Sequence, residues 1–560
     1  MPRSRMARSA ILGAVVGLAL VASAALAGRA QGQTPASADC GAAIGPQQTL
    51  DGHAYGPTAC TIAEARRIQN AAGAPYWRLE IGLDGTLAGY AALDGPRTEM
   101  FTDVPEMALA QRGSPGGWVP GIARYRADKG TGMTLFIPAA PADWNGALYV
   151  TAHGAGSYTP VGELVPREPD SFAPYTGANS YVGPMIDKGY AVAYTRRSAA
   201  RGPSDDEQAV LDDGRPLGGL SFAYHTGLLR DFTTVARNLV QQHLGRAPER
   251  TYFYGHSAGA ALGRLVNYLP GANTDGTGRS IFSGFLLDDA GGGYYLPQLF
   301  VDGQDVLFAT PAERARFAPQ IDVAHQAYTG EEGDYLTLKR ENARLLAAKG
   351  LGDLNRLYEI VGVSHFDAGR VAAMNGPAAA LADQNLDLGG VFDALVDALD
   401  AWVTGGQAPT PNRSDSYLLG GANGSGLERP AIRLPEIACP TGTYYVFPDG
   451  IEPQRLGTQV TAFAAYDGAG LEPLDNRGYL IDMNHNNTRD QRETVTQAWQ
   501  RRAVEGEPSG TLLPDESLTP AAYAACVEQA AAELVTANLL SPAAFRHYVE
   551  QAAQPALPSS

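Results

Sequence analysis

The chain has 560 residues, of which 44% are hydrophobic and 18% charged, and its net charge is −17. This composition supports a sizeable buried core and excludes global disorder. The acidic balance, without a Lys/Arg cluster beyond the N-terminal segment, also excludes the basic surface that nucleic-acid binding requires.

The N-terminal segment, residues 1–27, has the pattern of a secretory signal peptide. Three arginines precede an apolar run over residues 10–27, and Ala25 and Ala27 form an A-x-A cleavage site. A membrane anchor is the alternative, but the run is short and rich in small residues. We therefore expect export, to the periplasm or beyond the cell, and no segment that spans a membrane.

Four cysteines are present, and an even number in an exported chain indicates disulfides. Three pairings are possible. The pairing that closes the shorter loops joins Cys40 to Cys60 and Cys439 to Cys526, and we predict this one. No CxxC motif occurs, which disfavours a zinc site or a thioredoxin-like function.

Regular structure is predicted from about residue 120 onward, whereas residues 28–119 form an N-terminal extension that is hard to assign. Strands are expected at 122–127 and 133–137, around a glycine turn, and then at 146–152, 190–195, 251–254, 281–287, 321–328 and 356–361. Helices are expected at 222–244, after Gly259, and at 335–349 and 391–403. Residues 290–318 suit a lid or excursion.

Strands and helices alternate throughout residues 120–405, which predicts an α/β fold with a mainly parallel sheet covered by helices on both faces. In such a sheet the loops after the strands collect at one edge. A linker at 406–428 precedes a C-terminal accessory region, 429–560. This region ends in helices at 520–539 and 542–552, the second with Ser541 as its N-cap.

The sequence Gly-His-Ser-Ala-Gly, residues 255–259, follows a predicted strand and precedes a helix. This context is typical of a nucleophile elbow, a sharp strand-to-helix turn that exposes a serine. The flanking glycines are needed because any side chain there would clash with the neighbouring strand or helix. Ser257 is therefore the candidate nucleophile, and the N–H of Ala258 at the helix N-terminus is a candidate oxyanion donor.

A second glycine-rich loop, His153-Gly154-Ala155-Gly156, closes an earlier predicted strand. Its backbone can supply the other oxyanion donor, with Gly154 and Ala155 among the candidates. We expect His153 to hold this loop by hydrogen bonding. A plain turn is the alternative.

The general base is expected downstream of the serine. Of His325, His365, His485 and His547, only His365 ends a strong apolar strand in a glycine-containing loop of the regular unit. His325 lies within a strand, where a buried structural histidine is the better interpretation.

The acid that orients His365 is less sharply defined. Asp334 comes after the strand that precedes the strand of His365, and it ranks first. Glu332 lies two residues away, and Asp288 and Asp289 follow the strand before that. All four remain candidates.

Together these motifs resemble the α/β-hydrolase superfamily over about residues 120–405, and a serine esterase in particular. Residues 144–146 and 189–193 are similar to secreted esterases of the feruloyl esterase and tannase kind. Those enzymes usually carry cysteines beside the serine and the histidine, where this chain has His256, Ala258, Ser364 and Phe366.

The resemblance implies cleavage of a carboxylic ester through an acyl-enzyme on Ser257, with His365 and Asp334 completing the triad. A small-molecule or polymeric ester is the expected partner. Tyr294, Tyr295 and Phe300 are candidates to line its pocket. An amidase or peptidase on the same triad, or a non-catalytic binding protein with the same fold, are the alternatives.

Residues 482–493 have the spacing of an EF-hand calcium loop. Its candidate ligands are Asp482, Asn484, Asn486, Thr488 through its carbonyl, Asp490 and Glu493. Asn487 stands where glycine is usual, and Arg489 departs from the usual apolar position. The alternative is a polar turn before a helix. Bound calcium would be structural, because the loop lies outside the hydrolase unit. No cofactor is expected for catalysis.

Overall fold

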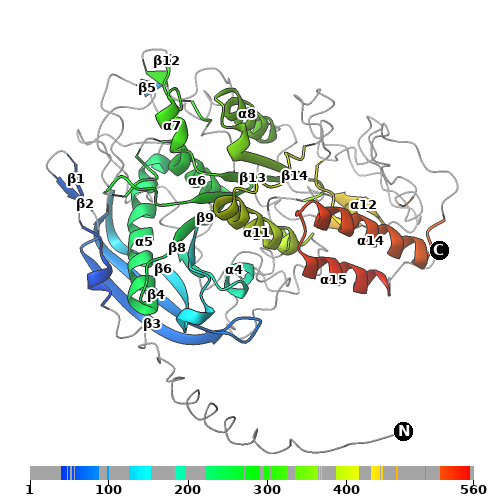
Figure 1. Cartoon of the computed structure of the whole chain (residues 1–560), viewed down its shortest axis with the longest axis horizontal. Coiled ribbons are helices and arrows are strands. Elements are labelled where there is room, and N and C mark those ends of the chain that lie inside the picture. The colour runs from blue at the N-terminus through cyan, green and yellow to red at the C-terminus, as the bar shows by residue number, and fades with distance from the viewer. Residues whose placement is uncertain are drawn as a thin grey trace, which may run out of the picture.

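The molecule is organised around one nine-stranded sheet (Figure 1). The computed structural model describes residues 39–46, 48–50, 53–55, 57–87, 98–99, 125–152, 183–195, 221–269, 271–275, 277–290, 296–298, 300–301, 304–325, 334–363, 365, 367–368, 386–414, 431–441, 443–445, 462–464, 499 and 517–554. The strand order is β14-β13-β10-β9-β7-β8-β6-β4-β3. These strands are β3 (Ala59–Gln69), β4 (Pro75–Leu87), β6 (Tyr125–Pro138), β7 (Ala147–Ala152), β8 (Ala191–Thr195), β9 (Arg250–His256), β10 (Gly284–Asp288), β13 (Gln320–His325) and β14 (Asn355–Ile360).

Six neighbouring strands of this sheet, β8, β7, β9, β10, β13 and β14, pair in parallel, as the alternation of strands and helices predicted. The helices are α4 (Gly183–Asp187), α5 (Ser221–Leu244), α6 (Ala258–Tyr268), α7 (Pro311–Ala315), α8 (Asp334–Ala348), α11 (Gly389–Gly405), α12 (Pro435–Ala438), α14 (Pro520–Thr536) and α15 (Pro542–Ala552). Both the α/β class and the mainly parallel sheet are therefore confirmed.

The sheet extends further toward the N-terminus than the predicted unit. Strands β3, β4 and β6 pair antiparallel and belong to the same sheet, although β3 and β4 lie within the predicted N-terminal extension. A period-two signal was available, because Leu79, Ile81 and Leu83 alternate along β4 and all are fully buried.

Strand β6 also differs from the prediction of two strands around a turn. It runs continuously, and residues 128–130 lie opposite the single residue Asp84, where the register shifts. The predicted glycine turn is thus an irregularity within one strand.

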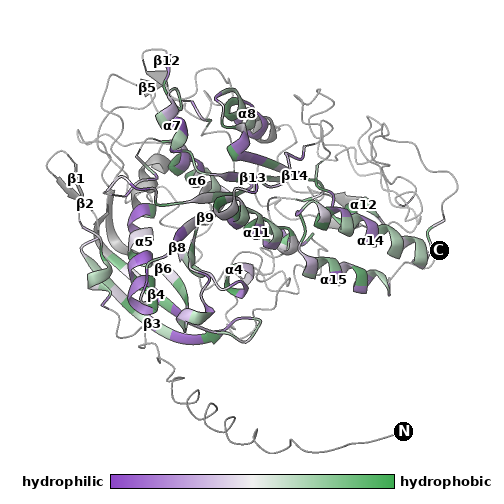
Figure 2. Cartoon of the chain, viewed as in Figure 1, coloured by the Kyte–Doolittle hydropathy of each residue, from purple (hydrophilic) through white to green (hydrophobic). Residues whose placement is uncertain are grey.

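Two apolar layers cover the sheet. On one face, α5 and α6 pack against inward residues of the central strands, such as Leu148, Val150 and Phe253. On the other face, α4 and α11 cover a cluster that includes Ile321, Val323 and Leu395. Figure 2 shows α5 with alternating hydrophilic and hydrophobic bands, as expected of a helix with one buried face.

The excursion at 290–318 packs against the outer side of α6 and α8. Leu307, Phe308 and Phe317 are buried in one cluster with Tyr268 and Leu346. Short strands β11 (Phe300–Val301) and β12 (Gln304–Asp305) form a small sheet with β5 (Thr98–Glu99), which comes from a distant part of the chain. Two further hairpins pair β1 (Gln48–Leu50) with β2 (His53–Tyr55), and β15 (Thr443–Tyr445) with β16 (Ala462–Ala464).

The C-terminal region packs directly on the hydrolase unit (Figure 1). Arg413 and Ile432 form bridges with β14, so the start of the predicted linker follows this edge strand. A Cβ atom added to Gly390 of α11 would lie 2.4 Å from Cβ of Ala544 in α15, which explains the glycine at this close approach. Ser541 caps α15 as predicted, accepting a hydrogen bond from the N–H of Ala544 at 3.2 Å.

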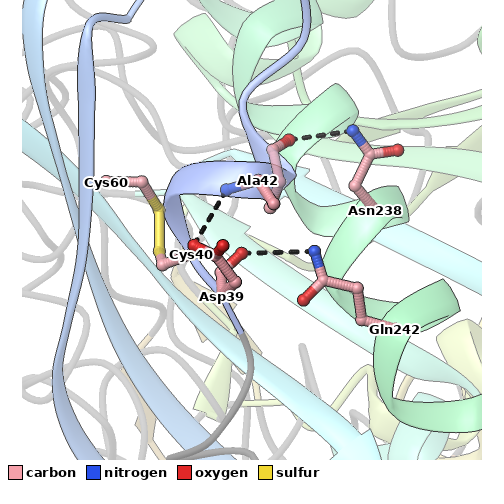
Figure 3. Close-up of a disulfide and its surroundings, with 7 residues drawn as sticks. Asp39, Cys40, Ala42, Cys60, Asn238 and Gln242 are labelled. Atoms are coloured by element: carbon pink, nitrogen blue, oxygen red, sulfur yellow. Dashed lines mark hydrogen bonds between the residues drawn. A yellow bond between two sulfur atoms is a disulfide. The ribbon is translucent and has the colours of Figure 1, made fainter.

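Both disulfides have the predicted pairing, Cys40–Cys60 and Cys439–Cys526. The first links the short helix η2 (Gly41–Ala43) to β3, and Figure 3 shows it beside α5. From α5, Asn238 donates to the carbonyl of Ala43 at 2.8 Å, and Gln242 donates to the carbonyl of Asp39 at 3.2 Å. Among the described residues, no helix combines the length and apolar character needed to cross a bilayer.

Candidate active site

Ser257 lies at the sharp turn between β9 and α6. Its backbone has φ 57° and ψ −125°, a strained conformation for a residue other than glycine. Its N–H donates to the carbonyl of Asp288 at 2.9 Å, which ties the turn to the end of β10. The side chain is partly exposed. The geometry is that of the predicted elbow.

The two glycines of the motif are required by close backbone contacts. A Cβ atom on Gly255 would lie 2.4 Å from the carbonyl oxygen of Gly259, and one on Gly259 would lie 2.2 Å from that of Ala152. Neither contact can relax, because both partners are backbone atoms. The steric reason given for these glycines from the sequence therefore holds.

His365, the predicted base, follows β14 and meets a carboxylate from β10. Its Nδ1 lies 2.6 Å from Oδ2 of Asp289, and both side chains are buried. Asp289 follows β10 directly and has a φ of 49°. The carboxylate beside the imidazole is thus Asp289, one of the alternatives, and the ranking of Asp334 first is corrected. Asp334 begins α8, and its side chain lies outside the described residues.

Two further groups contact Oδ1 of Asp289. Nζ of Lys339 lies 2.5 Å from Oδ1, and the N–H of His325 donates to the same oxygen at 3.0 Å. Burial opposes ionisation of Asp289, but Lys339, His325 and His365 offset it and hold the pKa of this carboxyl well below its ordinary value. Asp289 is therefore a carboxylate, as an imidazole-orienting group must be.

The imidazole of His365 is held neutral. Burial lowers the pKa of His365, and this effect outweighs the opposite effect of Asp289, with His325 and Lys339 acting in the same direction as burial. A neutral imidazole with Nδ1 bonded to a carboxylate leaves Nε2 as the proton acceptor. This is the protonation state that a general base needs.

A second histidine, which the sequence interpretation did not assign a role, joins the elbow to the His365 loop. Nε2 of His256 lies 3.0 Å from the carbonyl oxygen of His365, and the two rings lie 4.4 Å apart between centroids. In the sequence, the position of His256 next to Ser257 was the one indication of a role, because its partner in the structure lies 109 residues away. The residue before the elbow serine therefore contacts the base residue itself.

Ligand atoms of His256, Asp289 and His365 lie within 4.8 Å of one another, a spacing compatible with a metal ion. The direct contact of 2.6 Å between Asp289 and His365 leaves no room for an ion between them. We therefore assign this pair to hydrogen bonding.

The other residues singled out in the sequence lie on neighbouring elements or outside the described residues. His325 is buried in β13, in line with the structural role expected of it, while His547 is exposed on α15. Phe300 lies in β11, but its side chain is not described. The following candidates lie outside the described residues: the oxyanion residues Gly154 and Ala155, the pocket residues Tyr294 and Tyr295, and the calcium ligands Asp482, Asn484, Asn486, Thr488, Asp490 and Glu493.

A parallel sheet whose strand ends bring a serine elbow beside a buried histidine–aspartate pair defines the α/β-hydrolase class. A sequence model described as "Alpha/beta hydrolase domain" matches residues 219–550, more than half of the chain. The chain therefore belongs to this family. A search of proteins with curated function finds no match.

Solved structures of low similarity include hydrolases. The LpqC poly(3-hydroxybutyrate) depolymerase from Bordetella parapertussis is 15% identical with a TM-score of 0.30, over 58% of this chain and 100% of that one. Tannin acyl hydrolase from Aspergillus niger is 14% identical with a TM-score of 0.24, over 46% and 36% of the two chains. Esterase 2 from Thermogutta terrifontis is 14% identical with a TM-score of 0.26, over 45% and 85%. Similarity at this level carries no information about substrate.

Proposed function

We propose that the chain is an exported serine hydrolase that cleaves a carboxylic ester, with Ser257 as nucleophile, His365 as base and Asp289 as orienting acid. The observation that carries this proposal is the 2.6 Å contact between His365 and Asp289 in loops that adjoin the Ser257 elbow. Each of the three residues follows a different strand of the parallel sheet, so chain segments more than 100 residues apart meet at one edge.

In the first step, the Ser257 hydroxyl attacks the acyl carbon as its proton moves to Nε2 of His365. The tetrahedral intermediate collapses when His365 returns that proton to the alcohol oxygen, and the bond between carbon and this oxygen breaks. Water then attacks the acyl-enzyme and gives its proton to His365. Collapse of the second intermediate releases the acid and restores the Ser257 hydroxyl.

The oxyanion is assigned to two backbone donors. One is the N–H of Ala258, the first residue of α6, where the helix N-terminus favours negative charge. The second is the N–H of Gly154 or Ala155. The end of β7 supports this, because Ala152 lies against Gly259 of α6 and the loop residues follow it directly. Tyr294, Tyr295 and Phe300 remain candidates for the pocket walls.

Labelling with a fluorophosphonate probe tests the nucleophile. The wild-type protein and a Ser283→Ala variant, altered at the residue before β10, should react, whereas Ser257→Ala should not. Equal labelling of the wild-type protein and Ser257→Ala would reject Ser257. Failure of the folded wild-type protein to label would instead favour the non-catalytic alternative.

Matched p-nitrophenyl esters and anilides separate ester from amide hydrolysis. We expect turnover of the esters and much slower turnover of the anilides. The reverse preference would favour the amidase or peptidase alternative. An ester panel that varies the acyl and alcohol parts then defines the substrate.

Export and the calcium loop are tested separately. Two disulfides suit an oxidising compartment, and fractionation of expressing cells checks export.

For calcium, a chelator should lower the melting temperature, because a ligand bound only by the folded state stabilises it. Asp482→Ala should remove this sensitivity. An unchanged melting temperature in chelator would contradict the calcium proposal alone.

A further inference from the structure

Lys339 of α8 is a fully buried lysine whose ammonium group contacts the carboxylate of the proposed triad. Burial of a lysine is costly unless a partner compensates its charge. The chain also uses lysine sparingly, because only four of its 42 basic residues are lysines: Lys129, Lys188, Lys339 and Lys349. One of these four occupies the interior, 2.5 Å from Oδ1 of Asp289.

Groups from three elements face Asp289, and two more groups, from β9 and β10, extend the same polar cluster. Lys339 approaches from α8, His365 from the loop after β14, and His325 from β13, with its Nδ1 3.6 Å from Oδ2. On the far side of His325, its Nε2 lies 3.0 Å from Oδ1 of Asp288 in β10. Tyr254 of β9 donates to the other oxygen of Asp288 at 2.9 Å.

We propose that Lys339 is a positioning residue of the triad: it fixes the Asp289 carboxylate, and its charge lets His365 stay unprotonated at lower pH than a simple carboxylate–imidazole pair would allow. This inference rests on the proposed function of Ser257, His365 and Asp289. Lys339 acts through Asp289, and no contact with the reacting atoms is needed.

Lys339, Asp289 and His365 are buried together, so their charges interact more strongly than they would at the surface. The ring of His256 also faces His365, with 4.4 Å between the ring centroids. Asp289 contributes a buried negative charge, and the ammonium group of Lys339 compensates it. The positive charge of Lys339 also opposes a second positive charge on His365, so the imidazole is kept free to take the serine proton. Without Lys339, the uncompensated carboxylate of Asp289 would favour a proton on His365 before the reaction. In agreement, Lys339 is among the groups that lower the pKa of His365.

The pH profile of kcat/KM, measured with a p-nitrophenyl ester, tests the inference. In Lys339→Met, which removes the charge and keeps the length, the acid limb should move upward by about one pH unit. Activity at one pH unit below the wild-type midpoint should then fall by about tenfold. Lys339→Arg, which restores a positive charge, should return the limb toward the wild-type position.

Lys349→Met is the matched control. Lys349 follows α8 and donates to Asp305 and to the carbonyl of Leu307, both at 2.6 Å, and neither partner belongs to the proposed triad. Its acid limb should coincide with that of the wild type. A wild-type limb in folded Lys339→Met, or equal shifts in Lys339→Met and Lys339→Arg, would overturn the proposal.

If the Lys339 variants fail to fold, a measurement on the wild-type chain still tests the proposal. With lysine labelled at Cε and Nζ, only four side-chain signals arise, and substitution of the other three lysines identifies that of Lys339. The chemical shift of this signal should change with pH as His365 takes up its proton, and the midpoint of the change should equal that of the acid limb. A Lys339 signal that stays constant across that limb would refute the coupling. Loss of labelling in Ser257→Ala is independent of both outcomes, so failure of the proposed function is recognised separately.

Discussion

The two flanks of the sheet on either side of β9 are buried in different ways. On the flank of β7, β8, β6 and β4, the layer under α5 consists of apolar side chains such as Leu135, Leu148 and Phe232. On the flank of β10, β13 and β14, the helices α6 and α8 meet the sheet through fully or nearly buried ion pairs. These pairs are Arg264–Asp322, Lys339–Asp289 and Arg340–Glu359.

This difference matters because buried ion pairs seldom add stability over apolar contacts of the same size. The apolar flank is sufficient to hold a helix on a sheet. The charged flank includes Asp289 and lies beside His365 and the end of β9, where the site is assembled. We interpret the charges there as fixing one arrangement of the strand ends, at a cost in desolvation that the apolar flank avoids.

The largest effect on kcat is expected from a substitution in the charged flank at the site. Asp289→Asn should lower kcat by about 10⁴-fold, because an amide favours the wrong tautomer of the imidazole. Asp334→Asn, at the start of α8, should leave kcat within about twofold, because the carboxylate on His365 is Asp289. Circular dichroism checks folding of both variants. Inactivation by the Asp334 change, with little effect of the Asp289 change, would reverse the assignment of the acid.

The next largest effect, on stability, is expected at a buried ion pair away from the site. Arg264 donates to Asp322 with both Nε and a terminal nitrogen at 2.7–3.1 Å. Arg264→Met should destabilise the fold by about 3–5 kcal/mol, because it leaves an uncompensated buried carboxylate. The double variant with Asp322→Leu should recover most of this loss in denaturant unfolding. A double variant as unstable as the single one would show that the pair itself is stabilising, against our interpretation of this flank.

The apolar flank should respond only in stability. Leu148 in β7 is fully buried, and Leu148→Ala should cost about 3 kcal/mol through lost contacts and a cavity. The loss should be the same at pH 5 and pH 8, since no titrating group is removed. The acid limb of kcat/KM should also stay unchanged. A shifted limb would mean that the two flanks are coupled more closely than their packing indicates.

The smallest effect is the pH dependence that His365 itself confers. Its pKa is lowered in the folded state, so below pH 6.5 the unfolded chain takes up the proton first. The melting temperature should therefore fall as pH decreases below 6.5, and less so in His365→Gln. The acid limb of kcat/KM should likewise lie below pH 6.5. A limb above that value would contradict a neutral, buried base.

Much of the fold follows from local patterns. The helix at α5, the elbow around Ser257 and the parallel strands β7, β8, β9, β10, β13 and β14 were predicted within a few residues, because periodicity and turn residues act over short stretches of chain. The two disulfides were also predicted, since the shorter loops cost least to close. Strand β4 had a readable pattern, but its membership of the sheet depends on pairing with β6, which comes later in the chain.

The sequence by itself determined the elements and the elbow, because these depend on neighbours along the chain. The tertiary structure decided which carboxylate meets His365. Asp289 and Asp334 both follow predicted strands, and only the strand order and the backbone turn at Asp289 direct the first of them to the imidazole. It also decided that Lys339 and His256 adjoin the site. The physical reason is that sheet order is set by packing between distant segments, and no local pattern encodes it.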